Sequence, residues 1–261
     1  MESISKIVMI VEYDGTGYGG FQWQSNAPTI QGMIEESLYK LTGKSIRIAG
    51  ASRTDAGVHA KGQVVSFTTE SSFSMEVWGR ALNYYLPRDI VVREVYEMGD
   101  EFNVRRNATS REYHYSIINN KVRSPLRGKF SYLIAHPLDV VAMNQACQVL
   151  EGQHDFAPFC SPTKKTTMRN VFWTKVCRDL DWITFKICAS SFLPHQVRNT
   201  VGGLVRVGLG KMAVEDFKKV ALSGQAGVVG PMAPANALCL MQVQYPNFSP
   251  DAGEKDENLY S

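Results

Sequence analysis

The chain has 261 residues, 44% of them hydrophobic and 20% charged, a balance typical of a globular protein with a sizeable core. No apolar run approaches the length of a membrane span, and the N-terminal stretch Met1–Lys6 lacks the pattern of a secretory signal. We therefore expect a protein of the cytosol or nucleus rather than a membrane or secreted protein. The length allows one large domain or two of ordinary size.

Metal-binding patterns are absent from the sequence. The five cysteines and five histidines are scattered, and no Cys-x-x-Cys pair occurs among them. Structural zinc sites need closely spaced ligand pairs, so we predict no metal site. Most of the cysteines are expected to be small core residues in a reducing compartment.

The basic residues are clustered, although the net charge of +3 is too small to indicate nucleic-acid binding by itself. Such clusters can follow a phosphate backbone, and solvated loops are the alternative interpretation. The clusters are Arg105, Arg106 and Arg111; Lys121, Arg123, Arg127 and Lys129; and Lys164, Lys165 and Arg169.

Hydrophobic periodicity predicts alternating strands and helices in the first half of the chain. Thr29 and Ser74 are suitable N-cap residues for the two helices, and Gly43 is a suitable stop for the first. A loop with four glycines, residues 14–28, follows the first strand. The expected strands are Ile4–Tyr13, Ser45–Gly50, Gln63–Thr69 and Ile90–Glu97, and the helices begin after Thr29 and after Ser74.

The second half shows a similar order of elements without sequence similarity to the first. Strands are expected at Thr109–Ile118, Met168–Cys177, Trp182–Ala189 and Leu238–Tyr245, and helices at Leu138–Leu150, from about Pro194 to Gly208, and at Glu215–Leu222. The order β-α-β-β-α-β is that of the ferredoxin-like arrangement.

We therefore predict an α+β fold with two ferredoxin-like halves. Their sheets are expected to join into a mainly antiparallel central sheet, with the helices on one face and an active-site cleft on the other. The predicted domains are 1–104 and 105–246, followed by a polar tail, 247–261, that is expected to be disordered.

The turn Arg53–Gly57 interrupts two strand-like segments. Arg53 and Asp55 bring opposite charges into this turn, and Ala56 and Gly57 leave its backbone open to close approach. Such a turn could hold a flat ligand against an acid. The alternative is a structural Asp that bonds its own backbone, which is the commoner role of Asp in turns.

Two segments of the second half could provide partners for this acid. In the strand Thr109–Ile118, alternation places Arg111, Tyr113 and Tyr115 on one face, which we interpret as a face for base stacking rather than a core face. Arg198 lies one residue from the buried stripe of a helix and should have a partner, for which Asp55 is a candidate. A half-exposed sheet and a surface Arg with a buried stem are the alternatives.

The segment S-R-T-D-A-G-V-H-A-K-G-Q-V-V-S-F, residues 52–67, resembles the active-site motif of the tRNA pseudouridine synthase A family, TruA. Five further segments resemble other blocks of that family in the family's order. They are Y-D-G-T-G-Y-G-G-F-Q-W-Q, S-R-E-Y-H-Y-S-I, L-E-G-Q-H-D-F-A-P-F, F-L-P-H-Q-V-R-N-T-V-G-G-L-V-R-V-G-L-G-K and A-P-A-N-A-L-C-L. Together the blocks extend over nearly the whole chain.

The resemblance implies specific roles for four residues. Asp55 would be the catalytic aspartate, Tyr113 would pack on the target base, Arg198 would pair with Asp55, and Arg53 would help to hold or flip the nucleotide. The family modifies uridines of the tRNA anticodon stem-loop, around positions 38–40. It needs no cofactor, and it usually works as a homodimer; a cytoplasmic location is expected.

Three residues depart from the common bacterial pattern: Ser52 and Ala237 stand where Gly is usual, and Phe21 stands where Trp is usual. None of them removes a catalytic group, but they leave the modified positions of tRNA open. Two other functions are the alternatives. A catalytically silent RNA-binding protein would not need the Asp55, Tyr113 and Arg198 set, and a metal-dependent nuclease would need clustered carboxylates where the motif has one.

Overall fold

The computed structural model describes residues 4–164, 166–227, 229–246 and 248. Its contacts divide the chain into two compact units. The first unit contains the described residues up to Thr109 and those from Leu240 onward, and the second contains Ser110–Cys239. The predicted domain limits, 1–104 and 105–246, remain predictions, because compact packing does not test independent folding.

The first unit is a sheet with two helices. Its central strand β1 pairs antiparallel with β3 on one side and with β4 on the other, and β10 follows β3 in the strand order. The short strand β2 also pairs antiparallel with β3. The elements are β1 (Ser5–Tyr13), α1 (Ile30–Thr42), β2 (Ala49–Gly50), β3 (His59–Thr69), α2 (Met75–Tyr85), β4 (Ile90–Met98) and, from Leu240 onward, β10 (Leu238–Gln244).

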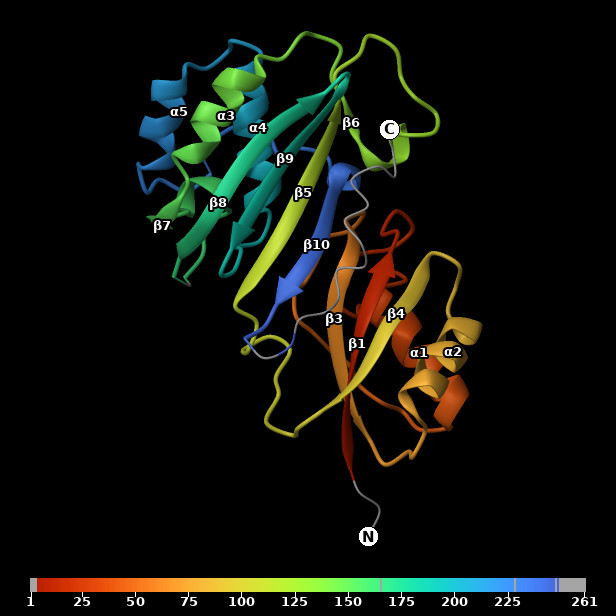
Figure 1. Ribbon diagram of the computed structural model, residues 1–261. Helices are drawn as coiled ribbons and strands as arrows, with labels where there is room; N and C mark the ends of the chain where they lie inside the picture. Colours follow the sequence, from red (N-terminus) through yellow and green to blue (C-terminus); the bar gives the residue numbers. More distant parts are fainter. Residues whose placement is uncertain (1–3, 165, 228, 247, 249–261) are drawn as a thin grey trace. The chain divides into compact units, whose positions relative to one another are not determined.

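The helices of this unit begin where the sequence predicts. The Thr29 side chain accepts a hydrogen bond from the Gly32 N–H, and the Ser74 side chain accepts one from the Val77 N–H, so each cap satisfies an otherwise unpaired backbone donor. Gly43 ends α1 in the left-handed conformation, with φ of 70°. Both helices lie on one face of the unit's sheet (Figure 1).

Strand β2 is shorter than the predicted strand Ser45–Gly50. Glu35 of α1 explains the difference, because its carboxylate pairs with Arg47 at 2.9 Å and accepts a hydrogen bond from the Ile48 N–H at 3.1 Å. These contacts hold residues 47 and 48 to the helix, and the chain reaches β3 only at Ala49. Strand β3 in turn begins at His59, four residues before the predicted start.

In the second unit the strands pair antiparallel in the order β5-β9-β8-β7, and β6 pairs parallel with β5. Helices α3, α4 and α5 lie together on one face of these strands (Figure 1). The elements are β5 (Ser110–Ile118), a 3₁₀ turn (Gly128–Phe130), β6 (Tyr132–Leu133), α3 (Val140–Gln148), β7 (Gly152–Asp155), a 3₁₀ turn (Ala157–Phe159), β8 (Met168–Asp179), β9 (Trp182–Ala189), α4 (Gln196–Gly208), α5 (Val214–Ala221) and a 3₁₀ turn (Ala235–Ala237).

The α+β class and the mainly antiparallel pairing are confirmed. The ferredoxin-like naming of the halves, the joining of their sheets and the cleft remain predictions. Of the predicted tail, residue 247 and residues 249–261 lie outside the described part. Phe248 is described, and it is buried against Phe102 and Tyr245 of the first unit.

The helix lengths and the burial of the cysteines can be read directly from the described residues. Every helix within them is too short or too polar to cross a bilayer. Cys147, Cys160 and Cys188 are buried, as expected of core thiols, whereas Cys177 and Cys239 are half-buried.

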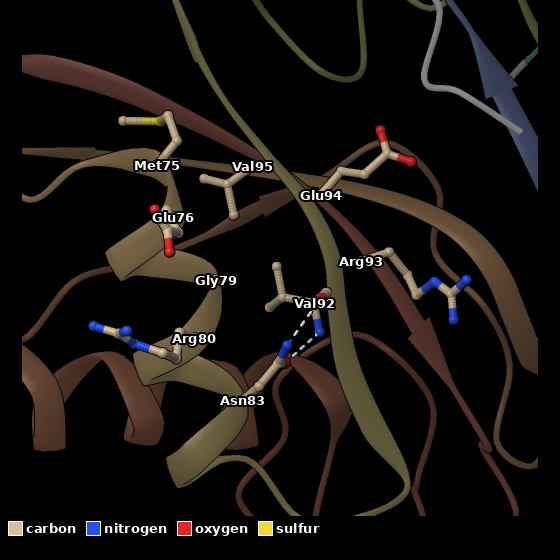
Figure 2. A pocket seen from close by; sticks show the side chains of 9 residues that line it. All are labelled: Met75, Glu76, Gly79, Arg80, Asn83, Val92, Arg93, Glu94 and Val95. Carbon is tan, nitrogen blue, oxygen red and sulfur yellow. Dashed lines mark hydrogen bonds between the residues drawn. The ribbon is translucent and has the colours of Figure 1, made fainter. Parts of the chain in front are cut away.

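A groove of about 390 Å³ lies between α2 and β4, at the edge of the first unit's sheet. Figure 2 shows the Asn83 carboxamide of α2 facing the backbone of Val92 in β4. The Asn83 Nδ2 donates to the Val92 carbonyl at 2.8 Å, and the Val92 N–H donates to the Asn83 Oδ1 at 2.7 Å. None of the predicted site residues lines this groove.

Candidate active site

The predicted acid, Asp55, lies in a tight turn immediately before β3. The Val58 N–H donates to the Asp55 carbonyl at 3.1 Å, and Gly57 has a φ of +79°, so the chain reverses direction within four residues. Asp55 is half-buried and Arg53 is exposed. The structure therefore brings these two predicted site residues together in one turn, with the guanidinium the more accessible of the two.

A glutamine side chain anchors the start of this turn. The pairing of β2 with β3 continues to Ala51, whose N–H donates to the Val64 carbonyl at 2.8 Å. At Ser52 the partner is the Gln63 carboxamide: its Oε1 accepts from the Ser52 N–H at 3.2 Å and its Nε2 donates to the Ser52 carbonyl at 2.8 Å. Gln63 is completely buried. Its carboxamide gives hydrogen-bond partners to the backbone N–H and the carbonyl of Ser52 where the chain leaves the sheet.

Thr54 is held on two sides. Its hydroxyl lies 2.8 Å from the Tyr13 hydroxyl of β1, and its carbonyl accepts from the Phe21 N–H at 3.1 Å. Tyr13, Thr54 and Phe21 are all buried. Because the residues on both sides of Arg53 are anchored in the core, the turn has little freedom to move.

The glycine loop packs directly on the turn. A Cβ at Gly15 would lie 2.0 Å from the Val58 carbonyl oxygen, and one at Gly20, whose φ is +100°, would lie 2.7 Å from the Thr54 carbonyl oxygen. Both distances are shorter than any real contact, so these positions require glycine. The His59 Nδ1 accepts a hydrogen bond from the Gly15 N–H at 3.0 Å, which fixes the loop to the start of β3. The loop is thus part of the framework that supports Asp55.

The tyrosine face of β5 is buried, which contradicts the prediction of an open stacking face. Arg111, Tyr113 and Tyr115 are 7%, 5% and 0% exposed, whereas residues 112, 114 and 116 on the other face are half-buried. The Arg111 Nη1 donates to the Ser190 carbonyl at 2.7 Å, and Tyr113 packs edge-on against Phe192 at 5.1 Å. A guanidinium whose hydrogen-bond donors have partners can be buried. The polar residues on this face were therefore not evidence that the face is exposed.

Arg198 projects from the first turn of α4, close to the start of the helix as predicted. Its Nε donates to the Ala233 carbonyl at 2.8 Å, and the Ala233 N–H donates to the Arg198 carbonyl at 3.2 Å. The adjacent Pro234 carbonyl accepts from the Tyr115 hydroxyl at 2.9 Å. Burial raises the pKa of Tyr115, and the charge of Arg198 acts in the opposite direction. Arg198 and Tyr113 belong to the second unit and Asp55 to the first, so the pairing of Arg198 with Asp55 stays a prediction.

Only some residues of the predicted basic clusters have side chains that could contact a phosphate. The guanidinium of Arg127 makes a two-point contact with the Asp181 carboxylate at 2.9 and 2.8 Å. Arg169 donates to the carbonyls of Thr166 and Met168, and Arg111 is buried. Arg105, Arg106, Lys121 and Arg123 are exposed, so solvent can reach them.

Comparison with known proteins identifies the relatives of this chain. A family model described as tRNA pseudouridine synthase matches residues 9–106 and 146–246. The tRNA pseudouridine synthase A of Syntrophotalea carbinolica is 39% identical over 93% of this chain and 97% of its own length. Those of Moorella thermoacetica and Geotalea daltonii are each 40% identical, over 89% and 92% of this chain and 96% and 99% of their own lengths.

The chain belongs to the tRNA pseudouridine synthase A family, TruA. Arg53, Asp55 and Arg198 lie within the segments that match the family model, and Tyr113 lies between them. The structural comparison adds little, because a crystal structure of an archaeal box H/ACA sRNP Nop10–Cbf5 complex covers 77% of this chain with a TM-score of only 0.40 and 8% identity.

Inspection of the TruA motif alone missed the residues that hold it in place. Tyr13, Thr54 and Gln63 stand within the blocks that resemble TruA, but the resemblance implies no role for them. The available signal was the presence of polar residues at positions where the pattern of β1 and β3 requires core residues.

Proposed function

We propose that the protein converts uridine to pseudouridine in the anticodon stem-loop of tRNA, around positions 38–40, with Asp55 as the nucleophile. Membership of the TruA family gives the reaction class, an isomerase that acts on tRNA. The observation that carries the assignment of Asp55 is its turn: a half-buried carboxylate beside an exposed guanidinium, held by buried hydrogen bonds from Tyr13 and Gln63.

The reaction needs an acid that is held in place and remains ionised. The N1–C1′ bond of uridine breaks, the base turns, and C5 bonds to C1′ while the C5 proton is lost and N1 gains one, so the product is an isomer. A carboxylate can attack C6 or C1′, or can remove a proton from the sugar, and all three routes require Asp55 within contact distance of the nucleotide. The anchored turn supports each route by limiting the motion of the acid.

The other three residues are proposed to act on the nucleotide. A base in a duplex is hidden, so the target must flip out at a cost of a few kcal/mol. Arg53 is exposed and can contact a phosphate as the nucleotide leaves the stack. Tyr113 would pack on the flipped base, and Arg198 would pair with Asp55 and favour its ionised form. Tyr113 is only 5% exposed, so this packing would use a small part of its surface.

The proposal includes a homodimer that binds tRNA and uses no cofactor, in a cytoplasmic location. These features follow from the family resemblance.

The test is pseudouridine formation on an unmodified tRNA transcript without added metal, mapped by carbodiimide-adduct primer extension. The wild type should produce a stop in the anticodon stem-loop. Asp55→Asn should reduce the signal to background while tRNA binding is retained, because the amide keeps the shape of the side chain but cannot act as a nucleophile. Glu36→Gln is the matched control, since Glu36 is an exposed acid on α1 that pairs only with Lys40 in the described contacts, and it should retain full activity.

Each outcome separates the proposed function from an alternative. Intact RNA without pseudouridine in the wild type would indicate a silent RNA-binding protein, and cleaved RNA would indicate a nuclease. Substantial activity in Asp55→Asn would remove Asp55 from the mechanism.

A further inference from the structure

The second unit contains a hollow of about 310 Å³ that no role proposed so far uses. We call it the α4 hollow. Residues of α4 and of the segment Pro231–Ala233 line it, together with Tyr132 of β6. Its volume is at the lower end of the range for small-ligand pockets, about 300 Å³. The lining residues are Tyr132, Gly202, Val205, Arg206, Leu209, Lys211, Pro231, Met232 and Ala233.

The hollow continues the stripe of α4 that carries Arg198. Gly202, Arg206 and Leu209 follow Arg198 at intervals of four, eight and eleven residues, so all of them face the same side of the helix. Helix α4 and the segment Pro231–Ala233 touch at the end nearest Arg198, because a Cβ at Gly202 would lie 1.9 Å from the Pro231 carbonyl oxygen. Ala233, which is bonded to Arg198, also lines the hollow. The segment Pro231–Ala233 is therefore shared by the hollow and the candidate site.

The end of α4 brings two cations to the hollow. Gly210 has a φ of +68°, the Gly210 N–H donates to the Val207 carbonyl, and the Lys211 N–H donates to the Arg206 carbonyl at 2.8 Å. This pair of bonds is the Schellman ending of a helix, in which the chain folds back over its last turn. Lys211 is consequently placed beside Arg206, and both residues line the hollow.

The lining favours an anion. It contains one guanidinium and one ammonium group, and no aspartate or glutamate is among its residues. The Arg206 Nη1 is only loosely engaged, at 3.4 Å from the Val229 carbonyl, and the Lys211 side chain is exposed. Tyr132 and the half-exposed Met232 add apolar surface against which a sugar or base can rest. Two cations beside an apolar wall match one nucleotide of a nucleic acid.

We propose that the α4 hollow binds the phosphate and ribose of a tRNA nucleotide near the target uridine. This inference rests on the proposed function. Arg206 lies about 12 Å along α4 from Arg198, at about 1.5 Å per residue. A stacked strand advances about 3.4 Å per nucleotide, so the bound nucleotide is about three or four positions from the uridine. That distance keeps it inside the anticodon stem-loop.

The test measures binding of a fluorescently labelled, unmodified tRNA transcript to the full chain over a series of KCl concentrations. Lys211→Gln and Arg206→Gln should each weaken binding about 5- to 10-fold near 0.1 M salt, because each removes about one unit from the slope of log K against log salt. Lys218→Gln is the matched control: Lys218 is an exposed lysine of α5 in the same unit, and its substitution should leave both quantities unchanged.

A short RNA hairpin with the sequence of the anticodon stem-loop tests the position of the nucleotide. The two variants should weaken binding of the hairpin by the same factor as binding of the whole tRNA. An effect on whole tRNA alone would place the contact elsewhere and overturn the proposal, as would an unchanged affinity and salt slope in Lys211→Gln. A thermal melt of each variant shows that it is folded.

Binding is measured independently of isomerisation. A failure of Asp55→Asn to lose activity would therefore contradict the proposed function and leave the salt-dependence result intact. The reverse result would be an active enzyme in which the Arg206 and Lys211 variants bind tRNA as tightly as the wild type. It would overturn only this inference.

Discussion

The hydroxyl of Tyr13 is the most specific link between the core of the first unit and the turn of Asp55. It lies 2.8 Å from the Thr54 hydroxyl, next to the acid in the chain, and the Gln63 Nε2 lies 3.4 Å from it. All three side chains are buried, so water cannot replace a missing partner. A small displacement at Thr54 would be passed to Asp55, and reactions that depend on orientation lose rate steeply with such displacements.

Tyr13→Phe is therefore expected to slow isomerisation at saturating tRNA by about 10-fold or more, while the ring and its packing are kept. The lost hydrogen bond should lower the free energy of unfolding by about 1 kcal/mol. Single-turnover kinetics and a thermal melt measure the two quantities.

Tyr245→Phe is the control for this change. The Tyr245 hydroxyl is also buried in the first unit, and it donates to the Val104 carbonyl at 2.7 Å, but it makes no contact with the turn among the described hydrogen bonds. Its loss should cost similar stability without slowing the reaction. Equal rates in the two variants would show that Tyr13 has only a structural role.

The sequence was sufficient to propose Asp55 and Arg53, because both stand in one segment that resembles the TruA active-site motif. It was not sufficient for the framework around them. Tyr13 and Gln63 reach the turn from positions 41 and 11 residues away, counted to Thr54 and Ser52 respectively, and their polar groups meet only after the strands pair. The same limit explains the error on the Tyr113 face, whose burial depends on a carbonyl supplied by Ser190.

At the scale of elements, the β8–β9 hairpin shows a local conflict between sequence and backbone. Asp179 pairs with Trp182, so Leu180 and Asp181 form a two-residue turn, and Leu180 has a φ of +51°. In a two-residue turn whose first central residue alone has a positive φ, that position strongly favours glycine. The Cβ of any other residue comes too close to the backbone there. Leu180 is 87% exposed, so it gains little from packing in return.

Leu180→Gly should therefore raise the free energy of unfolding by about 0.5–1 kcal/mol, the difference between the relieved strain and the added freedom of the unfolded chain. In a chain of this size the melting temperature should rise by about 1–3 °C. Differential scanning calorimetry measures the change.

Leu222→Gly serves as the control, because Leu222 is also an exposed leucine, at 52%, but its φ is −96°. That variant should gain nothing and lose some stability. A rise in both variants, or in neither, would contradict the role of the positive φ at Leu180.

Element prediction succeeded where periodicity was strong. The cap residues predict where helices α1 and α2 begin, and apolar runs predict strands β1, β5, β8 and β9. The short strands β6 and β7 were missed: β6 has two residues, and the β7 sequence G-Q-H-D contains no apolar residue. Both exist because a neighbouring strand supplies hydrogen-bond partners, which no local pattern reveals.

At the scale of the whole molecule, the two units contribute different parts of the proposed machinery. The first contributes the anchored acid and Arg53, and the second contributes Tyr113, Arg198 and the α4 hollow. Each unit contains buried apolar residues and helices of its own.

The groove beside β4 bears on how the molecule behaves at high concentration. An edge strand presents unpaired N–H and C=O groups that can recruit a strand from another molecule. Asn83 occupies both groups of Val92 with its carboxamide, as Figure 2 shows, and it thereby imitates the next strand of a sheet. The charged side chains of Glu76, Arg80, Arg93 and Glu94 surround the same position.

Asn83→Leu should expose this part of the edge and increase self-association, measured by light scattering over a range of protein concentrations near the melting temperature. Arg80→Leu adds a similar apolar side chain to the same groove but leaves the Val92 groups covered, so it should associate less. Equal association of the two variants would assign the effect to hydrophobicity alone. On this account, the Asn83 carboxamide protects the edge strand from pairing with another molecule, a role separate from catalysis and from tRNA binding.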